Sequence, residues 1–168
     1  MHADELRALQ APLKQRYRDD PRSAVVTLTA SGVLDAPGVS CRVETSRALV
    51  EAGLHPASGG TGLQVCSGDM LLEALVACAG VTLRAVATSL GIPVRAGTVR
   101  AEGDLDFRGT LGVSKEAKVG FGAIRLRFEL DSDATPEQLD TLLKLTERYC
   151  VVLQTLRSSP EVTIERSS

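Results

Sequence analysis

The sequence predicts an α+β domain, and three observations lead to this fold class. A nearly all-apolar stretch, residues 67–90, has the length and composition of a long helix. Stretches with the alternating pattern of strands come both before and after it. A second helical pattern, at residues 135–150, precedes the last predicted strand. We therefore expect antiparallel sheets around one long buried central helix.

Length and composition are those of an ordinary globular domain. The chain has 168 residues, of which 43% are hydrophobic and 24% charged, enough apolar material for a core. We expect one domain over residues 1–168, with residues 1–20 as a helical extension and residues 24–165 as the core. The net charge of −2 leaves no basic excess for phosphates, so general nucleic-acid binding is not expected.

The N-terminal half predicts a helix followed by a hairpin. The helix cannot continue through Pro21, because proline lacks the backbone N–H that a helix needs. In the second strand of the hairpin, Cys41 shares a face with Val39 and Val43, which indicates a buried structural thiol. The expected elements are a helix over 3–17, strands over 24–30 and 39–45 with a turn at 35–38, a third strand or short helix over 46–52, and a glycine-rich loop over 55–62.

The C-terminal half predicts two helices and several strands. Ser67 is the expected N-cap of the central helix, and Thr135 with Pro136 at the first helical position begins the other. The expected elements are helices over 67–90 and 135–150 and strands over 94–103, 105–111, 119–130 and 159–166.

The central helix favours a cytoplasmic homodimer. It carries Glu73 and Arg84, so a buried helix fits better than a membrane span. The first seven residues lack the basic-then-apolar pattern of a signal peptide. A helix that is apolar on every side has to be covered on every side, which a subunit of this size achieves best by dimerising.

The four cysteines are the residues most suited to chemistry. In a reducing compartment they are expected to be free or redox-active thiols, and with only His2 and His55 no metal site is expected. Cys78 lies about two and a half turns into its helix, too far from the N-terminus for that helix's dipole to activate it. It therefore needs a nearby cation, normally arginine, to react. The alternative is that Cys78 is a small core residue.

Two segments resemble motifs of the OsmC/Ohr family, the osmotically inducible and organic hydroperoxide resistance proteins. Ser67-Gly-Asp-Met-Leu-Leu-Glu-Ala-Leu-Val-Ala-Cys-Ala-Gly-Val-Thr-Leu-Arg is similar to the family's central-helix motif, in which a Leu-rich stretch separates an acidic residue from a cysteine. Arg148-Tyr-Cys-Val-Val-Leu-Gln-Thr-Leu is similar to its second cysteine motif. The order of the elements agrees, and the resemblance covers roughly residues 24–165.

The resemblance implies an intertwined homodimer that acts as a thiol peroxidase on organic hydroperoxides or hydrogen peroxide. It implies that Cys78 attacks the peroxide, that Cys150 resolves the product as a disulfide, and that a dithiol reductant restores both thiols. Asp69 matches the acidic residue that orients an activating arginine. The resemblance implies no haem, flavin or metal.

The sequence departs from the family pattern at two points. Residues 29–38, where the family has its activating arginine, contain none, which leaves Arg42 and Arg47 as candidates. Val151 replaces the proline that usually follows the resolving cysteine.

Two further residues and a second function remain open. Glu73 is expected to face the same cleft as Cys78 or to pair with an exposed cation. Cys66 is an alternative partner for Cys150 or a peripheral thiol. The alternative function is a non-enzymatic protein that binds an apolar small molecule in the dimer cleft.

Overall fold

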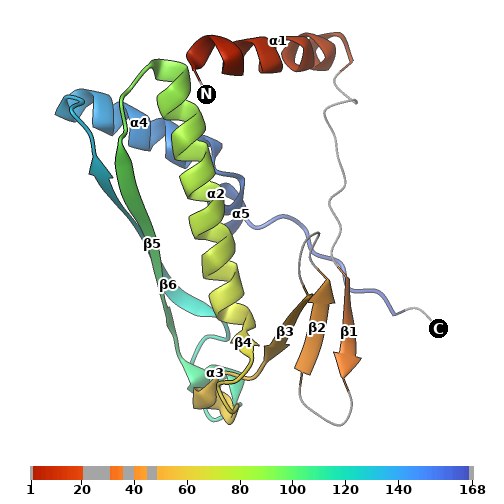
Figure 1. The fold of residues 1–168 in the computed structure, drawn as a ribbon. Helices are drawn as coiled ribbons and strands as arrows, with labels where there is room; N and C mark the ends of the chain where they lie inside the picture. The colour runs from red at the N-terminus through yellow and green to blue at the C-terminus, as the bar shows by residue number, and fades with distance from the viewer. Residues whose placement is uncertain (1, 21–30, 36–39, 45–48, 167–168) are drawn as a thin grey trace.

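The protein has the predicted α+β architecture, with a long helix at its centre (Figure 1). The structure, a computed structural model, describes residues 2–20, 31–35, 40–44 and 49–166. The elements in chain order are α1 (Ala3–Asp19), β1 (Ser31–Asp35), β2 (Ser40–Glu44), β3 (Leu49–Gly53), the 3₁₀ turn η2 (Pro56–Ser58), β4 (Val65–Cys66), α2 (Ser67–Leu90), β5 (Ala96–Leu105), α3 (Phe107–Thr110), β6 (Phe121–Asp131), α4 (Pro136–Tyr149) and α5 (Val151–Arg157).

The N-terminal sheet has the strand order β1-β2-β3-β4. β2 lies within the strand predicted over residues 39–45, and it pairs antiparallel with β1, which the sequence did not predict as a strand. β3 pairs antiparallel with β2, so the strand alternative is correct for residues 49–52, while residues 46–48 lie outside the described residues. The strand predicted over residues 24–30 lies outside the described residues, and β1 begins just after it. The side chain of Cys41, the predicted buried thiol, also lies outside the described part of the chain.

β5 and β6 form a long antiparallel hairpin along one side of α2 (Figure 1). Its inner face carries Val99, Ile124, Leu126 and Phe128 against the core. The strand predicted over residues 105–111 is wrong, because β5 ends at Leu105 and the helical turn α3 follows. The Asp106 side chain caps this turn by accepting a hydrogen bond from the Arg108 backbone N–H at 3.0 Å.

α2 contributes four of the buried residues of the core. Its buried residues recur every four positions and so form one stripe, namely Leu75, Ala79, Leu83 and Ala87. The helix ends at Gly91, whose φ of 67° is left-handed and whose N–H bonds to the carbonyls of Ala87 and Thr88. The predicted N-cap, Ser67, is wrong by one residue: Cys66 holds the cap position, without a side-chain hydrogen bond.

α4 begins as the sequence predicts. Thr135 caps it, and the Gln138 side chain bonds back to the Thr135 backbone N–H, which completes a capping box. The helix breaks at Cys150, and the short helix α5 follows. The closing strand predicted over residues 159–166 is wrong: this segment is neither helix nor strand, and Ile164 is 96% exposed.

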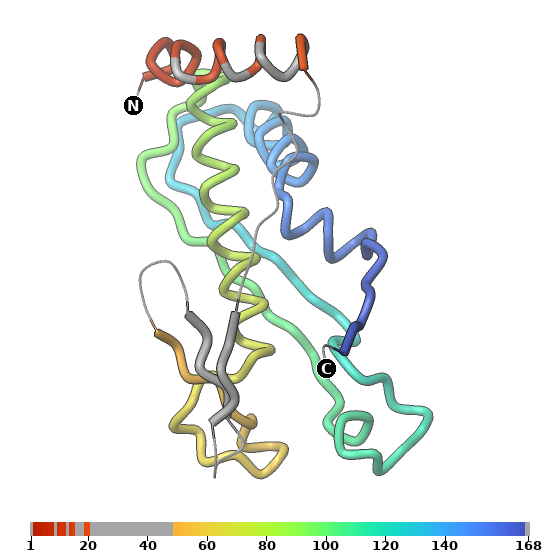
Figure 2. Tube along the Cα trace, turned by 90° about the vertical axis from the view of Figure 1, so that its right-hand side faces the viewer, coloured from red at the N-terminus to blue at the C-terminus, as the bar shows by residue number. Residues whose placement is uncertain are grey.

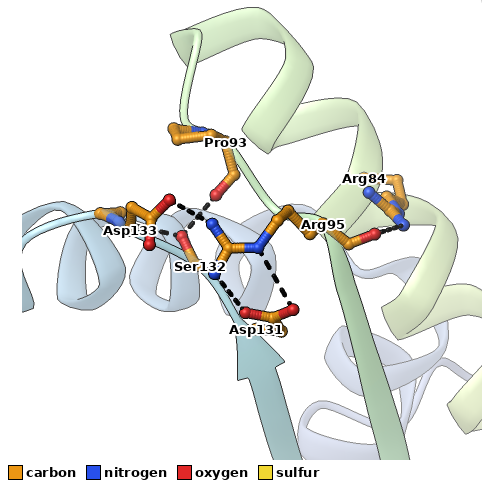
Figure 3. A network of polar contacts seen from close by, with 7 residues as sticks. Arg84, Pro93, Arg95, Asp131, Ser132 and Asp133 are labelled. Carbon is orange, nitrogen blue, oxygen red and sulfur yellow. Dashed lines mark hydrogen bonds and ion pairs between the residues drawn. The ribbon is translucent and has the colours of Figure 1, made fainter.

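A polar network ties α2 to the far end of the β5–β6 hairpin (Figure 3). Arg84 donates to the Val94 carbonyl at 2.6 Å, while Arg95 pairs with Asp131 and Asp133. Both views place α1 across the same end of α2 (Figures 1 and 2). The N-terminal half of α2, with the cysteines, therefore lies away from this network.

Candidate functional site

The structure brings Cys78 and Cys150 together. Cys78 on α2 is half-buried and packs against a buried cluster that contains Leu75, Ala79 and Cys150. The two thiols lie close enough for each to shift the pKa of the other. Two cysteines from distant parts of the sequence thus meet as free thiols, which is the arrangement that a reversible disulfide requires.

Cys150 owes its position to the break between α4 and α5. Its backbone is extended, with φ −73° and ψ 105°, so it serves both as the C-cap of α4 and as the N-cap of α5. Its N–H still bonds to the Thr146 carbonyl at 2.9 Å, and its own carbonyl accepts from the Gln154 N–H at 2.9 Å. The bend buries the Cys150 side chain completely and turns the first residues of α5 towards Cys78.

The pKa of the Cys78 thiol lies below its ordinary value. Burial acts to raise this pKa, but hydrogen bonds from the Val152 backbone N–H, from Cys150, from Thr82 and from the Val151 backbone N–H together outweigh it. These donors stabilise the thiolate as a cation would. The first residues of α5 thus contribute two of these donors, and Thr82, one turn further along the helix of Cys78, contributes another.

The pKa of Cys150 is shifted in the opposite direction. Burial raises it, and the hydrogen bond and negative charge of Cys78 raise it further, although N–H groups of Leu153 and Val152 act to lower it. The first proton of the pair consequently leaves Cys78, and Cys150 stays a protonated donor beside the thiolate. This asymmetry makes Cys78 the nucleophile of the pair.

Replacing Val151 with proline should raise the pH at which Cys78 reacts. Val151 is the first residue of α5, where proline is tolerated, and Cys150 has the extended backbone that proline favours in the residue before it. The change thus removes one N–H donor from the thiolate with little strain. A hydrogen bond to a charged group contributes about 1.5–3 kcal/mol, so the reaction midpoint should rise by about one to two pH units.

The measurement is the rate of iodoacetamide addition to Cys78 as a function of pH, followed by mass spectrometry of the Cys78 peptide. Val151→Ala is the matched control, because it shortens the same side chain but keeps the N–H. Identical midpoints for Val151→Pro and Val151→Ala would contradict a role for this donor.

The two acidic candidates lie elsewhere on α2. Nine residues span about two and a half turns, which puts Asp69 on the opposite side of the helix from Cys78. Asp69 and Glu73 are exposed and line a shallow groove together with Leu72, Val76, Ala77 and Ala101. Neither carboxylate has a hydrogen bond or ion pair with another described residue.

The arginine expected beside Cys78 is absent from the described part of the chain. The Arg42 side chain and all of Arg47 lie outside the described residues. Arg84, on the same helix as Cys78, is engaged by the Val94 carbonyl. Within the described residues, backbone N–H groups and neighbouring side chains do what the arginine was expected to do.

Cys66 stands apart from the pair. It is half-buried at the N-cap of α2, and it is not part of the cluster that holds Cys78 and Cys150. Its neighbour Gly68 lies close to both the Cys66 sulfur and the Phe121 ring. The structure thus gives Cys66 a place at the start of α2 rather than a contact with Cys150.

A cavity of about 510 Å³ opens on the Cys150 side of the pair. Its walls come from α2, β6, α4 and α5 and are mostly apolar, while Glu147 and Arg157 form an ion pair among its lining residues. The principal apolar side chains that line it are Leu75, Ile124, Leu126, Phe128, Leu143, Leu153 and Leu156. Cys150 lines this cavity and Cys78 does not.

Comparison with protein families supports the resemblance seen in the sequence. Residues 60–165 match the model of the family described as OsmC-like protein. The chain belongs to the OsmC-like family. The matched segment contains both cysteines and all of α2, α4 and α5. Comparison with curated proteins gives no match.

Solved OsmC-like structures share the fold. An OsmC-like protein from Mycoplasma pneumoniae is 16% identical, with a TM-score of 0.68 over 80% of this chain and 89% of that one. An organic hydroperoxide resistance protein OsmC from Legionella pneumophila is 18% identical, with a TM-score of 0.63 over 80% and 92%. An OsmC-like protein of unknown function from Vibrio cholerae is 16% identical, with a TM-score of 0.64 over 78% and 94%.

The main feature that sequence reasoning missed in this OsmC-like protein is α5 as the source of hydrogen-bond donors. The sequence feature that indicates these donors is Val151, which replaces the proline usual in the family. A proline at that position has no N–H to give, whereas Val151 donates to the Cys78 sulfur. The departure from the family pattern thus adds a donor to the thiolate.

Proposed function

We propose that this OsmC-like protein is a two-cysteine thiol peroxidase that reduces organic hydroperoxides or hydrogen peroxide. The observation that carries the proposal is the contact between Cys78, whose thiol pKa is lowered, and Cys150, whose thiol pKa is raised. A nucleophilic thiolate with a second thiol beside it is what peroxide reduction needs, because an unresolved sulfenic acid is open to further oxidation. The name of the Legionella pneumophila protein agrees with this chemistry.

The reaction uses both sulfurs in turn. The Cys78 thiolate attacks the terminal oxygen of the hydroperoxide, the O–O bond breaks, and the alkoxide leaves and takes a proton to become an alcohol. Cys150, as its thiolate, then attacks the Cys78 sulfenic acid and releases hydroxide, which becomes water. A dithiol reductant restores both thiols by two exchange steps and is itself oxidised to a disulfide.

The proposal includes a homodimer built on the core of residues 24–165. α2 is long and apolar enough to cross a membrane by length and composition, yet core helices of non-membrane proteins meet the same criterion. Val81, opposite the buried stripe, is 72% exposed. Leu71, one helical turn before Leu75, and Val151 of α5 are exposed as well. A second copy of the chain would cover these side chains and shelter Cys78. The proposal includes a cytoplasmic location, where a reducing environment would keep these cysteines as thiols.

Asp69, Glu73, Arg42 and Arg47 keep roles in this proposal as candidates. In the dimer, Asp69 is proposed to orient an arginine towards the site, and Arg42 and Arg47 are the arginines nearest in the sequence to the expected position. Glu73 lies on the same groove as Asp69. Cys66 is proposed to be a peripheral thiol.

The experiment is the consumption of cumene hydroperoxide by the purified protein with dithiothreitol as the reductant. We expect catalytic turnover, many equivalents per chain, and we expect Cys66→Ser to leave the rate unchanged. A rate equal to that of dithiothreitol alone, with all thiols still titratable, would rule the peroxidase out.

The cavity on the Cys150 side favours a second candidate, the binding of an apolar small molecule. Its lining is mostly aliphatic and aromatic, and its volume of about 510 Å³ falls in the range of small-molecule sites. Binding of an apolar fluorescent probe by a protein that consumes no hydroperoxide would favour this alternative.

A further inference from the structure

The junction of α4 and α5 is fastened from outside by a group of three side chains. The Glu147 carboxylate pairs with Arg157, and the Glu147 backbone carbonyl accepts a hydrogen bond from the Gln154 side chain at 2.7 Å. Both contacts run from the last turn of α4 to α5, so they bridge the break at Cys150. We call Glu147, Gln154 and Arg157 the junction clamp.

The junction needs such a clamp because α5 cannot set its own direction. It has only seven residues, and isolated helices of that length are unstable. The extended backbone of Cys150 interrupts the helix, so the rigidity of α4 does not pass on to α5. The orientation of α5 rests on its apolar contacts with the core and on the junction clamp.

We propose that the junction clamp is a positioning device that holds Cys150 against Cys78 in the geometry of the disulfide. A disulfide forms only when the two Cα atoms lie within about 7 Å and the side chains point at each other. If this geometry is already fixed in the dithiol state, less conformational entropy is lost when the disulfide forms. The effective concentration of each thiol at the other is then higher. The inference deepens the proposed function, since it rests on Cys150 as the resolving residue.

The test is the equilibrium between the dithiol form of the full chain and oxidised glutathione. The dithiol gives up two electrons and two protons to form the Cys78–Cys150 disulfide, and oxidised glutathione becomes two molecules of glutathione. Alkylation of the remaining thiols and mass spectrometry give the disulfide fraction at each glutathione ratio. No peroxide takes part, so the result is independent of whether the protein reduces hydroperoxides.

We expect Arg157→Met to lower this equilibrium constant about threefold and Gln154→Leu with Arg157→Met about tenfold, in line with exposed ion pairs and single hydrogen bonds. Arg157→Lys keeps the positive charge, so its equilibrium constant should lie close to that of the unmodified chain. Arg108→Met removes a comparable exposed pair with Asp106, away from the junction, and should have no effect. The proposal would be overturned if the Arg157→Met and double variants were folded by circular dichroism and had the same equilibrium constant as the unmodified chain. It would also be overturned if the unmodified chain formed no Cys78–Cys150 disulfide.

Discussion

Replacing Cys78 with serine should reduce hydroperoxide consumption to the rate of the reductant alone. Serine has nearly the same size, so the cluster of Leu75, Ala79 and Cys150 should stay packed. Its hydroxyl is not ionised at neutral pH, however, and none of the described donors to position 78 is a base that could ionise it. The measurement is steady-state consumption of cumene hydroperoxide with dithiothreitol.

The control for this variant is Cys66→Ser, which removes a half-buried thiol at the N-cap of α2 without touching the pair. It should consume hydroperoxide at the rate of the unmodified chain. Equal activity in Cys78→Ser and the unmodified chain would show that another residue attacks the peroxide, and the proposed role of Cys78 would fail.

Replacing Cys150 with serine should have a different effect. The variant should still reduce one equivalent of hydroperoxide through Cys78, but it should lose repeated turnover. The backbone donors of α5 remain, so the Cys78 thiolate can still attack one equivalent of hydroperoxide. No second thiol is then in contact with the Cys78 sulfenic acid, which accumulates and becomes open to over-oxidation. A rapid-mixing experiment without reductant should show one equivalent consumed rapidly per chain, followed by only slow consumption as the sulfenic acid over-oxidises.

The product in the Cys150→Ser variant should be trapped at Cys78 by dimedone, which adds to sulfenic acids. Sustained turnover in this variant with dithiothreitol, at the rate of the unmodified chain, would mean that the external thiol alone resolves the intermediate. Cys150 would then be a structural residue, and the asymmetry of the pair would have no catalytic use.

The sequence predicted the elements that are determined by local signals. α2 follows from its apolar composition. α4 follows from Thr135, whose side chain caps the helix, and from Pro136 at its first position. The first turn of α3 has a local signal as well, Asp106, which the alternating pattern around it obscured. The segment 159–166 alternates like a strand, but it pairs with no strand among the described residues, and alternation without a partner does not make a sheet.

The candidate site was predictable only in part, for a physical reason. That Cys78 and Cys150 belong together came from the resemblance to a family, because no spacing rule relates two cysteines on different helices. The donors of α5 were missed because Val151 and Val152 have strand propensity, which the packing of Val152, Leu153 and Leu156 against the core overrides. An arginine was expected because a cation stabilises a thiolate. Backbone N–H groups of α5 also stabilise it and lower the pKa of Cys78.

The most direct test of the central claim is to map the product of one equivalent of cumene hydroperoxide on the reduced, unmodified chain. Alkylation of the remaining thiols, proteolysis and mass spectrometry identify which sulfurs have reacted. The account predicts a single disulfide between Cys78 and Cys150, with Cys66 fully alkylated. Four alkylated cysteines, or a disulfide that involves Cys66 in place of either partner, would contradict it.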